Sequence, residues 1–180
     1  MIDLRHALPH AIECGGKLYE LNTDFRVWIE FLRSLEEDGI APFSVFAAEH
    51  PDGDEWIASA MEFARSENCT PHGSSKQTRQ AFDFIRDGDY IVGSFQHAYG
   101  IDLTDPGLSL HWHRFLALFR SLPEDTKMAE IMGYRTYAES KKKIEDTYKE
   151  LRTAWTLPAK IDPRTIEWQK AAFGNIEYPA

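Results

Sequence analysis

The stretch Leu108-Ser-Leu-His-Trp-His-Arg-Phe-Leu-Ala-Leu-Phe119 carries large apolar side chains around two histidines. On a helical wheel at about 100° per residue, one face collects a set of apolar residues, namely Leu108, Trp112, Phe115, Leu116, Phe119 and Leu122. This spacing predicts a helix from about Ser109 to Leu122 that packs in a core. The protein is therefore expected to be mainly α-helical.

The two histidines of this stretch raise the question of a metal site or a proton-transfer site. On a helix, His111 would lie at the margin of the apolar face, whereas His113 would lie on the polar side near Arg120. Two histidines that face apart cannot hold one ion. We therefore interpret them as one residue at the edge of the core and one at the surface.

Other arrangements in the sequence give weak signals for chemistry. Cys69 and His72 have a ligand-like separation but no partner pair, and His97 lies near Asp102 without a nucleophile motif. No G-x-S-x-G, phosphate-binding glycine loop or H-E-x-x-H pattern occurs in the chain. The sequence predicts no catalytic, cofactor-binding or metal-binding residue, although an enzyme using His97, His111 or His113 is the alternative to test.

The fold class follows from the segments on either side of the opening stretch. Two short strands, 11–14 and 17–21, flank Gly15-Gly16, which suits a two-residue hairpin turn. Apolar spacing and caps predict helices over about 25–37, 54–65, 90–99, 123–133 and 137–155. Asp87 or Asp89 is expected to cap the third of these. The chain is thus predicted to be a mainly α domain of about five to six helices with a small N-terminal β-hairpin (8–21).

The predicted domain spans residues 1–158 and is followed by a C-terminal tail, 159–180. The tail has one helix start signal, Asp162-Pro163, which is compatible with a short helix reaching Ala172.

Charge and composition exclude several function classes. The formal net charge is −9, and the only dense basic run, Lys141-Lys142-Lys143, is followed by acids, which argues against nucleic acid as a partner. The apolar runs are far shorter than the roughly 20 residues that span a bilayer, and no secretion signal is recognisable. With only two cysteines, a reduced, cytoplasmic setting is expected.

Several motifs together resemble a known family. "LNTDFRVW" (21–28), "FDFIRDGDYIVGSFQHAYGIDLTD" from Phe82, "LHWHRFLALFRSLPEDTKMAEIMGYRT" from Leu110 and the final "TLP" (156–158) closely resemble the bacteriophage gp-fifteen family of tailed phages and prophages. The resemblance covers roughly residues 8–158. Relatives commonly carry Trp-Trp where this chain has Trp112-His113, which argues against a ligand or base at His113.

The resemblance implies a role in phage tail morphogenesis, without catalytic residues. Genes of this family lie between those of the major tail protein and the tape-measure protein, a position typical of tail-assembly chaperones. The expected function is therefore a non-enzymatic tail-assembly chaperone that binds the tape-measure protein. The alternative is a structural component of the virion or tail junction, or a self-assembling oligomeric factor.

A candidate partner-binding stripe lies on the predicted helix 137–155. Its four apolar members are spaced by four, three and four residues, and they are Ile144, Tyr148, Leu151 and Trp155. Packing of this stripe on the protein's own core is the favoured interpretation, by about two to one. If the stripe is exposed, partner binding and self-association compete as explanations.

Overall fold

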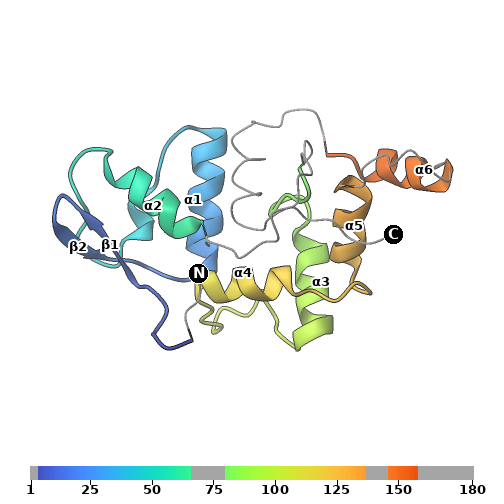
Figure 1. The fold of residues 1–180 in the computed structure, drawn as a ribbon, viewed down its shortest axis with the longest axis horizontal. Coiled ribbons are helices and arrows are strands. Elements are labelled where there is room, and N and C mark those ends of the chain that lie inside the picture. Colours follow the sequence, from blue (N-terminus) through green and yellow to red (C-terminus); the bar gives the residue numbers. More distant parts are fainter. Residues whose placement is uncertain (1–3, 66–79, 137–145, 158–180) are drawn as a thin grey trace. The chain divides into compact units, whose positions relative to one another are not determined.

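The computed structural model of the chain describes residues 4–65, 80–136 and 146–157 (Figure 1). The elements in chain order are β1 (Ala11–Cys14), β2 (Lys17–Glu20), α1 (Phe25–Glu37), the 3₁₀ turn η1 (Phe43–Val45), α2 (Trp56–Ala64), α3 (Gly88–Tyr99), α4 (Trp112–Arg120), α5 (Lys127–Thr136) and α6 (Asp146–Trp155). Six helices and one antiparallel hairpin in these residues confirm the predicted mainly α class.

The chain divides into two compact units. The first comprises Met1–Cys69 with Ser109–Ala117, and the second comprises Thr70–Leu108 with Leu118–Ala180. Helix α4 therefore begins in the first unit and ends in the second. The single domain over 1–158 stays a prediction, and the short helix considered in the tail lies outside the described residues.

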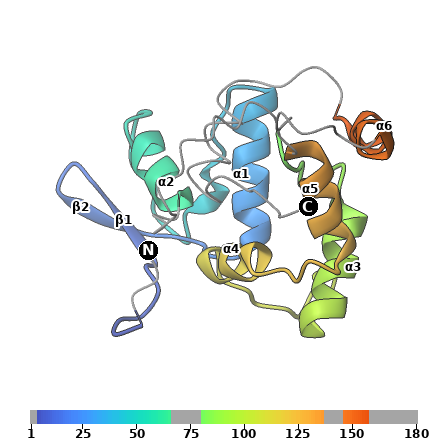
Figure 2. The same ribbon diagram turned by 45° about the vertical axis from the view of Figure 1, so that its right-hand side comes forward.

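In the first unit, the N-terminal hairpin forms where the glycine pair predicts it. Gly15 and Gly16 have φ angles of 59° and 78°, as a type I′ turn requires, and Cys14 faces Lys17 across the turn. Helix α2 lies beside β1 in both views (Figures 1 and 2), and the hydroxyl of Ser59 donates a 3.2 Å hydrogen bond to a β1 carbonyl. One edge of the hairpin is thus covered.

Aromatic side chains form the core of this first unit. The carboxylate of Asp24 caps α1 by accepting the N–H of Arg26 at 3.0 Å, and α1 then buries Trp28 and Phe31 completely. The ring of Trp28 lies 4.5 Å from that of Phe63 in α2. A capped amphipathic helix packed on a second helix explains why the predicted bounds of α1, 25–37, are confirmed.

The second unit has its own core from α3, α5 and the end of α4. Its fully buried members include Phe82, Phe95, Phe119, Met128, Ile131 and Met132. The hydroxyl of Ser94 in α3 accepts the N–H of Met128 near the start of α5, at 3.1 Å. Gly100, with φ 65°, ends α3 in the left-handed conformation that glycine adopts most readily. No helix in the described ranges is long and apolar enough to cross a membrane.

Candidate functional site

The stretch around His111 forms the first of two polar clusters that tie helix ends together. We call it the histidine junction and define it by Pro9, Phe63, Ala64, His111, Trp112 and His113. Every one of these residues belongs to the first unit.

His111 is the N-cap of α4. Its Nδ1 accepts the backbone N–H of His113 at 3.1 Å, and its Nε2 lies 2.9 Å from the carbonyl of Pro9. Because Nδ1 accepts, the ring proton must sit on Nε2, which then donates to Pro9. Burial lowers the pKa of His111, and His10 lowers it further, while the bond to the Pro9 carbonyl acts in the opposite direction. The junction therefore uses neutral imidazole as a helix cap.

The prediction that the two histidines face apart is wrong. Their ring centroids are 5.3 Å apart, because His111 precedes the first helical turn and the wheel does not apply to it. The assignment of His113 to the surface is wrong as well, since only 7% of it is exposed. Helix α4 begins at Trp112, three residues after the predicted start at Ser109.

Trp112 and His113 cap the opposite kind of helix end, the C-terminus of α2. The indole N–H of Trp112 donates to the carbonyl of Ala64 at 3.0 Å, and Nε2 of His113 lies 2.7 Å from the carbonyl of Phe63. The His113 ring also stacks on Phe63, with centroids 4.6 Å apart. The last carbonyls of a helix have no partner within it, so these two side chains satisfy groups that would otherwise be buried unpaired.

The starts of α1 and α4 are also joined to each other by reciprocal backbone bonds. The N–H of Phe25 donates to the carbonyl of Leu110 at 3.0 Å, and the N–H of Trp112 donates to that of Thr23 at 2.7 Å. Each donor is the first residue of its helix. The stacked rings of Phe25 and Phe115, 4.9 Å apart, lie beneath this pairing. The histidines therefore serve a structural junction, and no three His, Cys, Asp or Glu residues in the described ranges could hold a metal ion.

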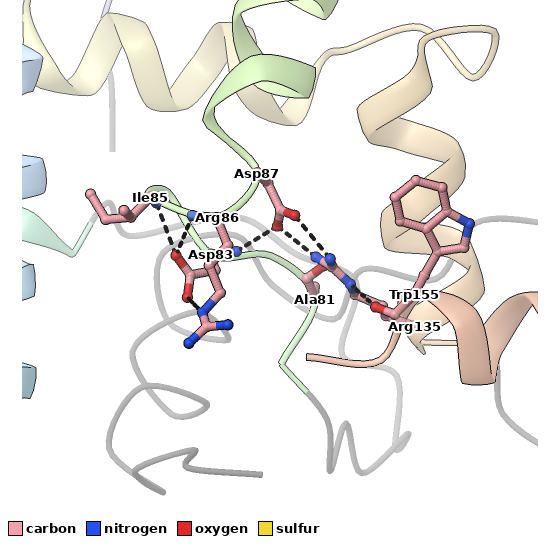
Figure 3. A network of polar contacts seen from close by, with 7 residues as sticks. All are labelled: Ala81, Asp83, Ile85, Arg86, Asp87, Arg135 and Trp155. Carbon is pink, nitrogen blue, oxygen red and sulfur yellow. Dashed lines mark hydrogen bonds and ion pairs between the residues drawn. The ribbon is translucent and has the colours of Figure 1, made fainter. Parts of the chain in front are cut away.

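The second cluster lies in the second unit and is built on a buried ion pair (Figure 3). We call it the arginine junction, comprising Ala81, Asp83, Asp87, Arg135 and Trp155. The Arg135 guanidinium binds both carboxylate oxygens of Asp87, at 2.6 and 2.9 Å. The two side chains are only 6% and 3% exposed.

Arg135 also links three segments of the second unit. Its Nη1 donates to the carbonyl of Ala81 at 3.2 Å, and its Nε donates to the carbonyl of Trp155, the last residue of α6, at 2.7 Å. The Asp87 carboxylate accepts the N–H of Asp83 at 2.8 Å as well. The guanidinium thus donates four hydrogen bonds, which offset the free-energy cost of burying its charge.

Sequence reasoning missed this junction, although it singled out Asp87. Asp87 does occupy the N-cap position of α3, but its side chain makes no capping bond and turns to Arg135 instead. The local signal, an acid before a helix, is typical of a cap. Nothing in the spacing of the two residues indicates that they pair.

The predicted partner-binding stripe lies on α6, with one member outside the described residues. That member is Ile144, while Tyr148, Leu151 and Trp155 are half-buried. Tyr148 makes an edge contact with Tyr134 of α5 at 6.1 Å, and Trp155 makes one with Tyr90 of α3 at 5.4 Å. The stripe thus packs partly on its own unit and stays partly open, so its role in partner binding stays a prediction.

The remaining residues considered for chemistry are not brought together. Nε2 of His97 lies 3.8 Å from Asp125, and both side chains are largely exposed. Asp102 instead accepts the N–H and hydroxyl of Thr104, at 2.8 and 2.6 Å, which closes a local turn and holds the pKa of its carboxyl below the usual value. Cys69 and His72 lie outside the described residues.

The described helices and hairpin define a mainly helical protein. The polar side chains of its two junctions hold helix ends in place. The family model described as "Bacteriophage Gp15 protein" matches residues 4–157, a range that contains both junctions. The chain belongs to this family, as the motifs predicted. Membership indicates a phage structural or morphogenesis protein. No curated protein and no solved structure matches the chain significantly.

Proposed function

We propose that this protein is a non-enzymatic tail-assembly chaperone that binds the tape-measure protein of its phage in the host cytoplasm. The observation that carries the proposal is the family match over residues 4–157. The two junctions support the non-enzymatic part, because their histidine, acid and arginine side chains are engaged in helix packing.

Helix α6 supports the binding part of the proposal. Of the described elements, α5 makes the principal contacts with α6. Arg135 binds the last carbonyl of α6, at its C-terminus. Tyr148, Leu151 and Trp155 leave part of their apolar surface open. An anchored amphipathic helix with a half-open apolar stripe is suited to pair with a helical, apolar-patterned partner.

The test is co-expression with the tape-measure protein encoded in the same phage genome, followed by affinity purification and size-exclusion chromatography. A complex at micromolar concentration is expected. Leu151→Asn should weaken it about tenfold, since a half-buried apolar anchor becomes polar. Ala154→Asn, on the exposed face of the same helix, is the matched control and should leave the complex intact.

Two outcomes would contradict the proposal. One is the absence of any complex when both proteins are soluble and folded. The other is mass spectrometry of purified virions that finds the protein in fixed copy number, because a chaperone leaves the finished particle. That second result would favour a structural component of the tail instead.

A further inference from the structure

The first unit carries an exposed segment, residues 36–55, in which all formal charges are negative. It contains seven carboxylates and no lysine or arginine, and its acids are Glu36, Glu37, Asp38, Glu49, Asp52, Asp54 and Glu55. All seven are exposed. Arg33 pairs with Glu37 and Lys17 with Glu49, but the segment itself contains no positively charged side chain.

Apolar side chains are exposed in the middle of this acidic segment. Ile40 is 66% exposed and Phe43 is 47% exposed. One face of the Phe43 ring stacks on His50, with centroids 4.2 Å apart, and Trp56 lies 5.3 Å away beneath it. We call this surface, formed by Ile40, Phe43, His50 and Trp56 with the seven acids, the acidic aromatic face.

Trp56 adds an independent observation. It is 1% exposed, yet its indole N–H has no hydrogen-bond partner among the described residues. A buried donor without an acceptor is costly and uncommon in folded proteins. Its aromatic neighbours are Phe31, Phe43 and Phe46, and the half-exposed Phe43 is therefore part of its cover. Because Phe43 is part of this cover, the indole N–H signal of Trp56 should report on a ligand that binds at Phe43.

We infer that the acidic aromatic face binds a cationic, apolar segment of a partner protein, with lysine or arginine flanking a large aliphatic or aromatic side chain. The carboxylates attract the basic residues, and Ile40 and Phe43 supply the apolar anchor points. The same charge repels anionic partners such as nucleic acid. The proposed function is needed only to identify the partner as the tape-measure protein.

The probe is a synthetic peptide of about 18 residues, five helical turns, that places leucine on one face and lysine on the other. Two matched peptides replace lysine by glutamate or leucine by serine. Binding to the full chain labelled with ¹⁵N is followed through the indole N–H signals, with that of Trp56 assigned from Trp56→Phe. The Leu/Lys peptide should shift the Trp56 signal and lose affinity at high salt, and the other two should bind at least about tenfold more weakly.

Variants locate the site. Ile40→Ser, and separately Asp52→Asn with Asp54→Asn and Glu55→Gln, should each lower the affinity about tenfold. The controls are Leu18→Ser, an equally exposed leucine on β2, and Glu124→Gln with Asp125→Asn and Glu150→Gln, which remove the same number of charges elsewhere. The controls should change affinity by less than about twofold.

The inference is overturned if the controls weaken binding as much as the face variants, because the peptide would then respond only to net charge. It is also overturned if the glutamate peptide binds equally well. Failure of the proposed function is a separate result. If the peptide binds at this face but the tape-measure protein does not co-purify, only the proposed function falls. If the tape-measure complex forms but the Leu/Lys peptide does not bind, or binds Ile40→Ser as well as the unmodified chain, only this inference falls.

Discussion

The two junctions tie helix ends together with opposite chemistry. The histidine junction uses neutral groups, namely an imidazole cap, an indole N–H and reciprocal backbone bonds. The arginine junction uses one ion pair with side chains 6% and 3% exposed. Each neutral bond contributes about 1 kcal/mol net, whereas breaking a buried ion pair from one side leaves a bare charge in the core. Removing single bonds from the histidine junction should therefore lower the free energy of unfolding in small steps. Removing one partner of the ion pair in the arginine junction should lower it in one large step.

The largest expected effect is the loss of Arg135. Arg135→Met leaves the Asp87 carboxylate buried without its cation and should lower the free energy of unfolding of the second unit by about 3–5 kcal/mol. Amide hydrogen exchange in α3 and α5 under native conditions measures this unit directly. Arg86→Met, at an exposed arginine near the same loop, is the control and should change exchange little.

A double variant tests whether the charge itself is the cause. Asp87→Leu combined with Arg135→Met removes both charges and should recover part of the stability lost in Arg135→Met alone. If the double variant is as unstable as Arg135→Met alone, or less stable, then packing and the bonds to Ala81 and Trp155 matter more than the uncompensated charge.

The next effect concerns the neutral junction. Trp112→Phe keeps most of the buried ring but removes the donor to Ala64, which leaves a buried carbonyl unpaired and should cost about 1–3 kcal/mol. Denaturant unfolding of the full chain, followed by exchange of the α2 amides, measures it. Trp155→Phe is the comparison, because Trp155 contributes its carbonyl to Arg135 and that bond survives the change. If both variants lose the same free energy of unfolding, the loss arises from the smaller ring volume and not from the missing hydrogen bond.

Local patterns account for what could be predicted from the sequence. Gly15-Gly16 predicts the hairpin, and the capped apolar repeat predicts α1 to the residue. The apolar spacing predicts the start of α4 too early, because histidine is not among the residues that usually signal an N-cap. The helix class and the family follow from such short-range signals.

The junctions could not be predicted, since their partners are distant in the chain. His113 meets a carbonyl 50 residues away, and Arg135 meets a carboxylate 48 residues away. Spacing rules describe neighbours on one element, so they say nothing of pairs that only tertiary packing brings together. The role of the α6 stripe in partner binding stays a prediction, and its member Ile144 lies outside the described residues.

Acid should weaken the neutral junction. The pKa of His111 is lowered in the folded state from a reference of 6.5, so the unfolded chain binds this proton more readily. The stabilising contribution is therefore present above about pH 6.5 and is lost as the pH falls toward the folded value. A protonated Nδ1 could no longer accept the helix N–H. Unfolding followed from about pH 7.5 to about pH 5 should show this decline.

The variant His111→Asn separates the effect of the N-cap hydrogen bond from the effect of protonating His111. Asparagine can accept the same helix N–H but does not ionise, so the decline with pH should become shallower. Some stability should be lost at neutral pH, because the bond to Pro9 is gone. An unchanged pH slope in this variant would show that His111 is not the group responsible.

The smallest effect is expected at the ion pair between Lys17 and Glu49. Its nitrogen and oxygen are 2.6 Å apart, the same separation as in the shorter contact between Arg135 and Asp87, but the two side chains are 58% and 77% exposed. Each partner shifts the other's pKa toward its charged form, yet water and salt screen an exposed pair. Lys17→Ser should therefore leave the unfolding midpoint unchanged within error at physiological salt. If it destabilised the first unit as Arg135→Met destabilises the second, distance rather than burial would govern these ion pairs.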